Sequence, residues 1–400
     1  MLVMAFFRAV SINILSTGLP NYVIYDMGRS SFLAGLTNTS YCGVYAAFTF
    51  LTGHLSDKIG RKTMLNIGVI GCNLVFIGYL FNLPIELLIA ARALEGLFTA
   101  FIWPAMMATL SDVQEIDDNG EDRLSKYNFS WNAGTIIGSA AGALAVFWFS
   151  NNSIIFYIGY MGIILLIPFL IWLKLPTKAE LDAIKKETES AKKEIMHDTD
   201  PIADEITISA KNNGRRIGLS AIPLWIPAIT ITINTLTFGG IFLIASTKFE
   251  AQGIPSYLVY VLSFSRTAAA TAFAHLAVKR TSLNFKKYTL LGGLLIGFSS
   301  VIYAFLLNLP VYVLLAVLMG VGGIITYTSS FKIVADKNAA KSTGKYAGYF
   351  EGIIGIGSGI SPFILGYIAD YNYNAAFLTI GVFGIISSLI IFVYIRKNDT

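Results

Sequence analysis

Charged residues are scarce in this chain. Asp, Glu, Lys and Arg make up 13% of its 400 residues, about half the share found in an average soluble domain. Apolar residues make up 55%, and the mean hydropathy is +0.65. Because a soluble protein of this length must carry charge on its surface, this composition excludes a soluble enzyme. It equally excludes a disordered chain, a collagen-like fibre and a disulfide-rich scaffold.

Cysteine and histidine are also few, with two and three residues. Cys42 and Cys72 both fall inside apolar stretches, so we expect small packing side chains and no disulfide. The histidines, His54, His197 and His275, lack the spacing of metal ligands. The sequence therefore predicts no metal site and no cofactor.

Long apolar runs dominate instead. A transmembrane helix needs roughly 20 mostly apolar residues to cross about 30 Å of hydrocarbon. Twelve such runs lie between charged or turn-rich breaks, at residues 2–25, 31–53, 63–81, 85–111, 125–149, 153–174, 218–247, 255–278, 288–307, 310–332, 344–369 and 374–395. They predict an all-α protein that crosses the lipid bilayer of the cell membrane twelve times.

The basic residues are sorted by these runs. Twenty-four of the 29 Lys and Arg residues fall on one side, and Arg29 and Lys248 fall on the other. Three lie inside the runs: Arg8, Arg92 and Arg266. Because basic residues collect on the cytoplasmic side, both termini and the long middle loop are expected in the cytoplasm. The net charge of +5 then reflects topology, and a nucleic-acid partner is not expected.

The two halves of the chain resemble each other. Residues 12–18 recur at 233–239, and residues 82–85 recur at 308–311, each about 220 residues apart. An even number of spans per repeat preserves orientation, so a parallel duplication is expected. The predicted organisation is a six-helix bundle at 1–174, a cytoplasmic linker at 175–217 and a second six-helix bundle at 218–400.

The loop after the second run carries a specific spacing. Its residues are Gly53, Asp57, Lys58, Gly60, Arg61 and Lys62. This pattern closely resembles the signature of the major facilitator superfamily: Gly, three residues, Asp, a basic residue, one residue, Gly and two basic residues. The resemblance implies a cytoplasmic latch in which Asp57 faces a helix N-terminus or a neighbouring Arg61 or Arg123, where unpaired N–H groups attract a carboxylate. A short basic loop beside a membrane is the alternative, and the second repeat has Val278 in place of the Asp.

The fourth run places polar residues on one helical face: Arg92, Glu95, Thr99, Trp103 and Met106. Arg92 to Gly96 is similar to a second family motif, with Glu95 in place of Gln. Charges in hydrocarbon normally face the protein interior or a water-filled cavity. Two interpretations stay open: a structural ion pair, or a functional pair in which Arg92 holds an anion or a proton path and Glu95 titrates.

Two further runs are rich in glycine. Gly134 to Ala143 resembles the antiporter motif of the fifth helix, although Ser139 replaces its Pro, and close helix packing is the alternative. The eleventh run places Glu351 among several glycines, and Arg266 is its expected partner. Arg8 in the first run either extends to the membrane surface or contacts substrate.

The family resemblance implies two bundles that rock about a central cavity lined by the first and fourth helix of each. The candidate cavity residues are Asn13, Thr17, Arg92, Glu95, Thr99, Trp103, Thr230, Asn234, Thr237, Thr326, Tyr327 and Ser330. No ATP-binding loop is present, so proton coupling is expected. Because burial disfavours a charged carboxylate, Glu95 and Glu351 are the candidate proton carriers, with Arg92 and Arg266 as partners.

The expected function is a monomeric secondary transporter for a small molecule. Trp103, Met106 and Tyr327 beside a few charges favour export of an amphipathic organic solute. Three buried Arg against two buried Glu favour the alternative, which is uptake of an organic anion with protons. A sensor without transport is less expected, and an intramembrane enzyme is not expected, because neither a His-Glu-x-x-His nor a Gly-x-Ser-x-Gly motif occurs.

Overall fold

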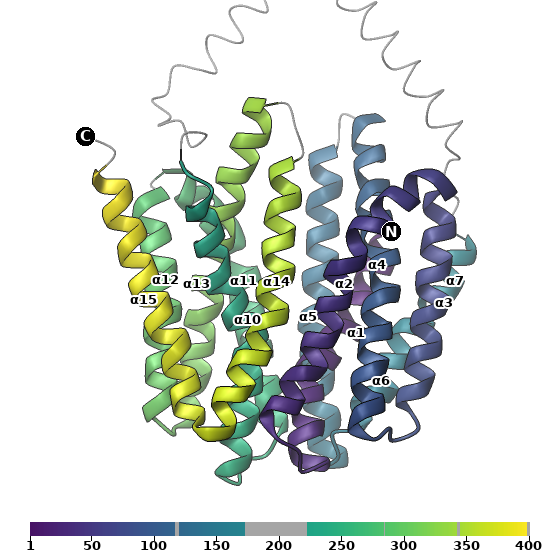
Figure 1. The fold of residues 1–400 in the computed structure, drawn as a ribbon, viewed down its shortest axis with the longest axis horizontal. Coiled ribbons are helices and arrows are strands. Elements are labelled where there is room, and N and C mark those ends of the chain that lie inside the picture. The colour runs from purple at the N-terminus through teal and green to yellow at the C-terminus, as the bar shows by residue number, and fades with distance from the viewer. Residues whose placement is uncertain (117–119, 173–221, 284, 342–344, 398–400) are drawn as a thin grey trace, which may run out of the picture.

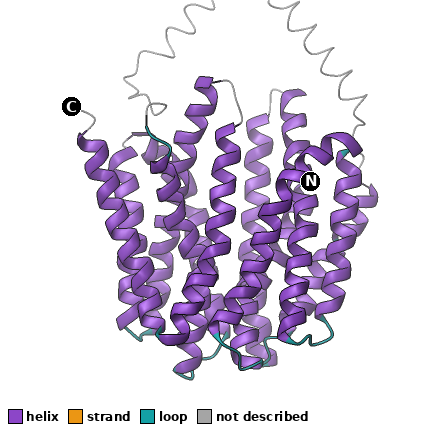
Figure 2. Ribbon diagram, viewed as in Figure 1, coloured by secondary structure: helices purple, strands orange, loops and turns teal. Residues whose placement is uncertain are grey.

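The computed structural model describes residues 1–116, 120–172, 222–283, 285–341 and 345–397, and these form helices joined by short loops (Figure 2). The helices are α1 (Leu2–Asn21), the π-helical η1 (Tyr22–Asp26), α2 (Ser31–Ile59), α3 (Arg61–Tyr79), α4 (Ile85–Ile116), α5 (Gly120–Phe149), α6 (Ile154–Ile164), α7 (Leu166–Trp172), α10 (Trp225–Ala251), α11 (Tyr257–Leu283), α12 (Phe285–Phe305), α13 (Leu309–Lys341), α14 (Lys345–Tyr371) and α15 (Tyr373–Lys397). The prediction of an all-α membrane protein is confirmed.

Within the described ranges, nine helical segments are long and apolar enough to cross a membrane. They are Leu2–Asp26, Arg61–Tyr79, Phe129–Phe149, Ile154–Trp172, Trp225–Ala251, Phe285–Phe305, Leu309–Val334, Gly352–Tyr371 and Tyr373–Lys397. Helices α2, α4 and α11 are not among the nine. The count of twelve spans therefore stays a prediction.

Some helix ends differ from the apolar runs. The seventh run was expected from residue 218, but α10 begins at Trp225. Residues 222–224 are not helical, and Pro223 disfavours helical backbone at Ile222 before it. At the other extreme, α13 continues to Lys341, beyond the apolar run that ends at 332. Helix α13 is therefore longer than the apolar run that crosses the hydrocarbon, and its last turns extend beyond that run.

The helices form two bundles side by side (Figure 1). The N-terminal bundle, α1 to α7, packs around buried residues such as Leu15, Phe76 and Phe156. The C-terminal bundle, α10 to α15, has its own apolar core with Ile244, Tyr303 and Phe377. The expected linker, 175–217, lies outside the described residues, so the domain boundaries stay predictions.

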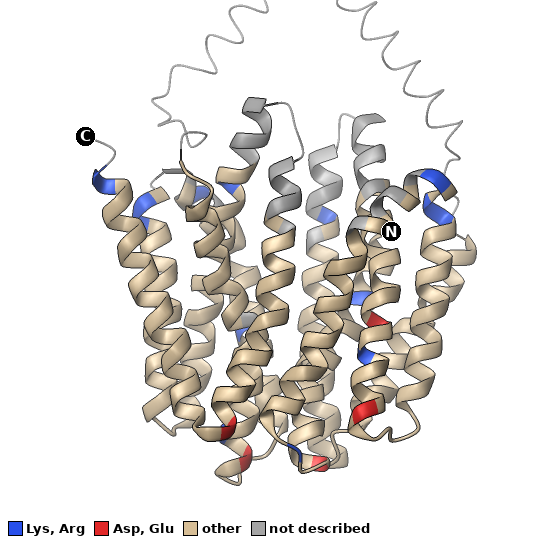
Figure 3. Cartoon of the chain, viewed as in Figure 1, with Lys and Arg blue, Asp and Glu red and all other residues tan. Residues whose placement is uncertain are grey.

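Charge separates the two ends of the molecule. We call the end from which the chain leaves toward 173–221 the linker end, and the opposite one the far end. Lys and Arg gather at the linker end and acidic residues at the far end (Figure 3). Lys248, expected on the side opposite most basic residues, lies in α10 near the far end and is only 4% exposed. Its ammonium donates to the carbonyls of Tyr303 at 2.7 Å and Ala304 at 3.0 Å in the last turn of α12, where carbonyls lack partners within the helix.

The bundles meet along two helix pairs, α2 with α14 and α5 with α11. Among the described residues, ten hydrogen bonds cross between the bundles, and all lie toward the far end or the middle of the helices. They link Thr17 and Ser139 to Ser263, Asn21 to Ser246 and Ser256, Tyr25 to Ile254, Ser31 to Thr247 and Asp370, Phe32 to Asp370, Thr39 to Gly359 and Asn152 to Ser256. The described conformation is closed at the far end.

Small residues let the helices approach closely. A Cβ on Gly134 of α5 would clash with the Phe6 carbonyl of α1, and one on Gly142 would clash with the ring of Tyr260 from α11. Between the bundles, a Cβ on Gly35 of α2 would overlap the carbonyl of Pro362 on α14. Close packing therefore accounts for the glycine-rich stretches of α5 and α14.

Candidate coupling and substrate site

Helix α4 carries the ion pair at the centre of the candidate site. Arg92 and Glu95, one helical turn apart, both face the interior, and their side chains are 1% and 0% exposed. Nη1 of Arg92 donates to Oε2 of Glu95 at 2.6 Å. The spacing that predicts one shared face therefore also produces direct contact.

Two neighbouring helices complete the surroundings of this pair. The hydroxyl of Tyr79, at the end of α3, donates to the same Glu95 oxygen at 2.9 Å. Nη2 of Arg92 donates to Oδ1 of Asn38 on α2 at 3.0 Å. The Arg92 guanidinium lies over the ring of Tyr41 at 4.4 Å from its centroid, a favourable cation–π contact. Arg92 is thus held by groups from both α2 and α4.

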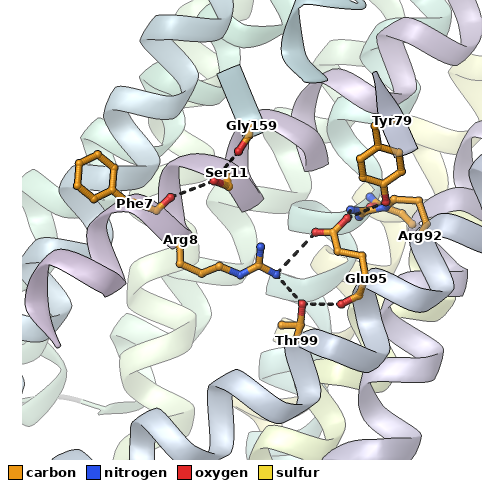
Figure 4. A network of polar contacts seen from close by, with 9 residues as sticks. Phe7, Arg8, Ser11, Tyr79, Arg92, Glu95, Thr99 and Gly159 are labelled. Atoms are coloured by element: carbon orange, nitrogen blue, oxygen red, sulfur yellow. Dashed lines mark hydrogen bonds and ion pairs between the residues drawn. The ribbon is translucent and has the colours of Figure 1, made fainter. Parts of the chain in front are cut away.

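Arg8 enters the network from α1. Its Nη2 donates to the hydroxyl of Thr99 at 2.5 Å and lies 3.7 Å from Oε1 of Glu95 (Figure 4). The Thr99 hydroxyl in turn donates to the backbone carbonyl of Glu95 at 2.7 Å. Arg8 is 1% exposed, so of its two expected orientations the extension to the membrane surface is wrong.

The network holds more positive than negative charge. Two guanidiniums, of Arg8 and Arg92, share the single carboxylate of Glu95. Nε and Nη1 of Arg8 have no hydrogen-bond partner among the described residues, and neither has Oε1 of Glu95. A buried charge is costly unless it is paired, and here one positive charge has no carboxylate of its own. The cluster is therefore suited to bind an anion.

Sequence reasoning missed three members of the network: Asn38, Tyr41 and Tyr79. Asn38 could have been singled out, because it is an amide within the apolar run 31–53. Tyr79 lies near the end of its run, where tyrosine is common at membrane interfaces, so nothing distinguished it.

The second bundle has a smaller polar group. Arg266 on α11 is 7% exposed, and its Nη2 donates to Oδ1 of Asn234 on α10 at 3.4 Å. The side chain of Glu351 lies outside the described residues. Its expected pairing with Arg266 stays a prediction.

The other cavity candidates fall into two groups. Some contact other helices: Asn13 accepts from Ser139 at 2.7 Å, Thr17 shares a hydrogen bond with Ser263, and the Trp103 ring packs against Trp131. Tyr327 is 36% exposed. The second group consists of buried hydroxyls that donate to carbonyls of their own helix, namely Thr230, Thr237, Thr326 and Ser330. In this conformation these four hydroxyls are already satisfied.

The signature residues were expected in a loop, but they lie at the end of α2 and the start of α3, and Gly60 alone separates the two helices. Gly60 has φ +92°, a conformation that glycine adopts without strain. Nη1 of Arg61 donates to Ser56 at 3.0 Å, and Lys58 and Lys62 are exposed. The side-chain positions of Gly53, Asp57 and Arg123 lie outside the described residues, so the latch expected there stays a prediction. No group of His, Cys, Asp and Glu in the described part of the chain could hold a metal ion.

The chain matches a family model, several individual proteins and a set of solved structures. The family model of the Major Facilitator Superfamily matches residues 1–337 and 262–400. An MFS-type transporter of Bacillus subtilis, YqjV, is 32% identical over 30% of this chain and 29% of its own length. The multidrug transporter mfsB of Aspergillus fumigatus is 33% identical over 30% of this chain and 20% of its own. The chain thus spans less than a third of the length of YqjV and of mfsB. A protein of Arabidopsis thaliana, named putative glycerol-3-phosphate transporter 3, is 23% identical over 91% of this chain and 76% of its own.

Solved structures match over almost the whole chain. A POT peptide transporter has a TM-score of 0.71 at 16% identity, covering 99% of this chain and 93% of its own. The nucleoside transporter NupG has a TM-score of 0.72 at 13% identity, covering 98% of both chains. Fold and family model agree, and the chain belongs to the Major Facilitator Superfamily.

Proposed function

We propose that this protein is a proton-coupled secondary transporter that moves a small organic solute across the cytoplasmic membrane by alternating access. The observation that carries the proposal is the buried cluster of Arg8, Arg92 and Glu95, in which two cations share one carboxylate. Charged side chains inside a membrane protein typically belong to ion or substrate pathways.

Glu95 is the proton acceptor in this proposal. Arg92 lies on the same helix and moves with it, whereas Arg8 lies on α1 and is 3.7 Å away. A small shift of α1 against α4 would lengthen the Arg8 contact and leave the Glu95 carboxylate with Arg92 as its one close cation. Protonation would remove the negative charge and leave both guanidiniums to another anion, or to water.

Topology supports an orientation of the protein in the membrane, and the names of two relatives support export as the direction of transport. Basic residues gather at the linker end, which by the positive-inside rule is cytoplasmic together with both termini. The closed far end is then the outer side. Two of the similar proteins are named as a multidrug transporter and a multidrug efflux pump, which supports export of an amphipathic solute.

Uptake of an organic anion is the second candidate. The excess of guanidinium over carboxylate in the cluster favours it, because a carboxylate or phosphate would balance the charge. The name of the relative that matches most of this chain, a putative glycerol-3-phosphate transporter, agrees with this alternative.

The test is transport by the purified full-length chain in liposomes, with a panel of amphipathic dyes and organic anions. Under an imposed pH gradient the wild type accumulates its solute, and Glu95→Gln loses that accumulation. Solute exchange without a gradient persists in Glu95→Gln, which shows that the variant still binds. Thr109→Val on the same helix, whose buried hydroxyl is bonded within that helix and is not a cavity candidate, is the control and transports normally. Accumulation by Glu95→Gln at the wild-type level would show that Glu95 is not the proton carrier.

A further inference from the structure

A carboxylate from one bundle caps a helix of the other at the far end. Asp370, in the last turn of α14, accepts hydrogen bonds from the backbone N–H of Ser31 at 2.5 Å and of Phe32 at 3.1 Å. Ser31 is the first residue of α2, where N–H groups have no partner within the helix. Bonds to a charged acceptor are stronger than neutral ones, and the positive end of the helix dipole adds to them.

The helices around this contact are packed backbone to backbone. A Cβ on Gly366, one turn before Asp370, would overlap the carbonyl of Ser31 at 2.6 Å. The Ser31 hydroxyl shares a further hydrogen bond of 2.7 Å with Thr247 on α10. The start of α2 is therefore held by two helices of the opposite bundle, and Gly366 is what permits their approach.

The spacing of these two residues repeats the family signature. Gly366 and Asp370 stand in the same Gly-x-x-x-Asp pattern as Gly53 and Asp57. The first copy ends α2 at the linker end, and the second ends α14 at the far end. Because α2 and α14 are antiparallel neighbours, the two copies lie at opposite ends of one helix pair.

We propose that Gly366 and Asp370 form a far-end latch, the counterpart of the signature loop at the linker end, and that it holds the transporter closed at the far end. This inference rests on the alternating-access part of the proposed function. In the described conformation the far-end latch is engaged. Opening of the far end requires Asp370 to leave α2.

Solvent can take over the contacts of this carboxylate. A pocket of about 460 Å³ opens beside it, and its charged and titratable lining residues are Arg29, Glu250, Asp370, Tyr371 and Tyr373. Glu250 provides a matched control, because it is a carboxylate in the same pocket that makes no hydrogen bond to the other bundle among the described residues. Release of Asp370 into this pocket exchanges its two bonds to α2 for bonds to solvent.

The test measures opening directly, without substrate. Ser246 is 0% exposed and bonds Asn21 across the bundles, so a cysteine there reacts slowly while the far end is closed. The full chain with Cys42→Ala, Cys72→Ala and Ser246→Cys is placed in lipid nanodiscs and treated with a membrane-impermeant maleimide. Asp370→Ala raises the labelling rate about tenfold, because two charge-assisted bonds are lost. Asp370→Asn, which keeps one acceptor oxygen, gives a smaller increase, and Glu250→Gln gives none.

A second measurement, of the distance between the bundles, tests the latch independently of cysteine labelling in case an Asp370 variant folds poorly. Spin labels at Glu86→Cys and Leu307→Cys, both exposed at the far end of different bundles, report the separation of the bundles. The distance distribution shifts to longer values in Asp370→Asn and in Gly366→Leu. Unchanged labelling and unchanged distances in the Asp370 variants, with full labelling after denaturation, would overturn the latch. If the Asp370 variants change labelling and distances as expected but the wild type shows no proton-driven transport, the latch stands and the proposed function alone is overturned.

Discussion

The two bundles share short sequence patterns but place buried charge differently. In the N-terminal bundle, Arg8, Arg92 and Glu95 contact one another. The corresponding positions of the second repeat, about 220 residues on, are apolar: Ile229, Leu318 and Val321. An ionic cluster therefore occupies these positions in only one bundle. The buried cations of the second bundle, Lys248 and Arg266, lie at other positions.

The largest effect is expected from Arg92→Leu, which copies Leu318 of the second repeat into the first. The substitution leaves Glu95 buried with only the more distant Arg8, and breaking a buried ion pair costs about 3–5 kcal/mol. A denaturant titration of the protein in detergent micelles measures the loss in free energy of unfolding.

The matching control removes all three charges. Arg8→Met, Arg92→Leu and Glu95→Leu together are expected to recover at least half of the lost stability while abolishing proton-driven transport, because no unpaired charge stays buried. Wild-type stability in the single variant would mean that the cluster is not a coupled unit.

An intermediate effect is expected from Lys248→Met in the C-terminal bundle. There the buried cation is balanced by helix-end carbonyls of α12 instead of a carboxylate. Loss of these hydrogen bonds is expected to cost about 1.5–3 kcal/mol in the same titration. Exposed Lys279→Met is the control and should change stability by less than about 0.5 kcal/mol. A loss as large as that of Arg92→Leu would show that the two bundles do not differ in this respect.

The smallest effects come from a pair of buried hydroxyls, one in each bundle. Thr99→Val removes the acceptor of the 2.5 Å bond from Arg8, so a cost of about 1 kcal/mol and slower transport are expected. Ser388→Ala in α15 removes a hydroxyl bonded only to its own helix, so a cost below about 0.5 kcal/mol and normal transport are expected. Unfolding and transport rates are compared side by side. Equal effects would contradict the distinction between the bundles.

Local periodicity predicts part of this site and misses the rest. Arg92, Glu95 and Thr99 are three or four residues apart, so the helix repeat alone places them together. Arg8 and Thr99 are 91 residues apart, and Asp370 and Ser31 are 339 apart, so their contacts depend on how the bundles pack. The helices could be predicted because apolar length determines them. The non-helical backbone of residues 222–224 was missed, and Pro223 restricts Ile222 there in a way that hydropathy does not measure.

The line along which α2 meets α14 has a kinetic consequence. Along most of it the residues in contact are small: Ser31, Gly35, Thr39, Gly359 and Gly366. At the far end, Phe32 of α2 also packs edge-on against Phe363 and Tyr367 of α14. Separation of the two helices therefore breaks a few hydrogen bonds, which water can replace one at a time, and exposes this aromatic cluster. The activation barrier for switching is then expected to depend on both the polar groups and the burial of the three rings.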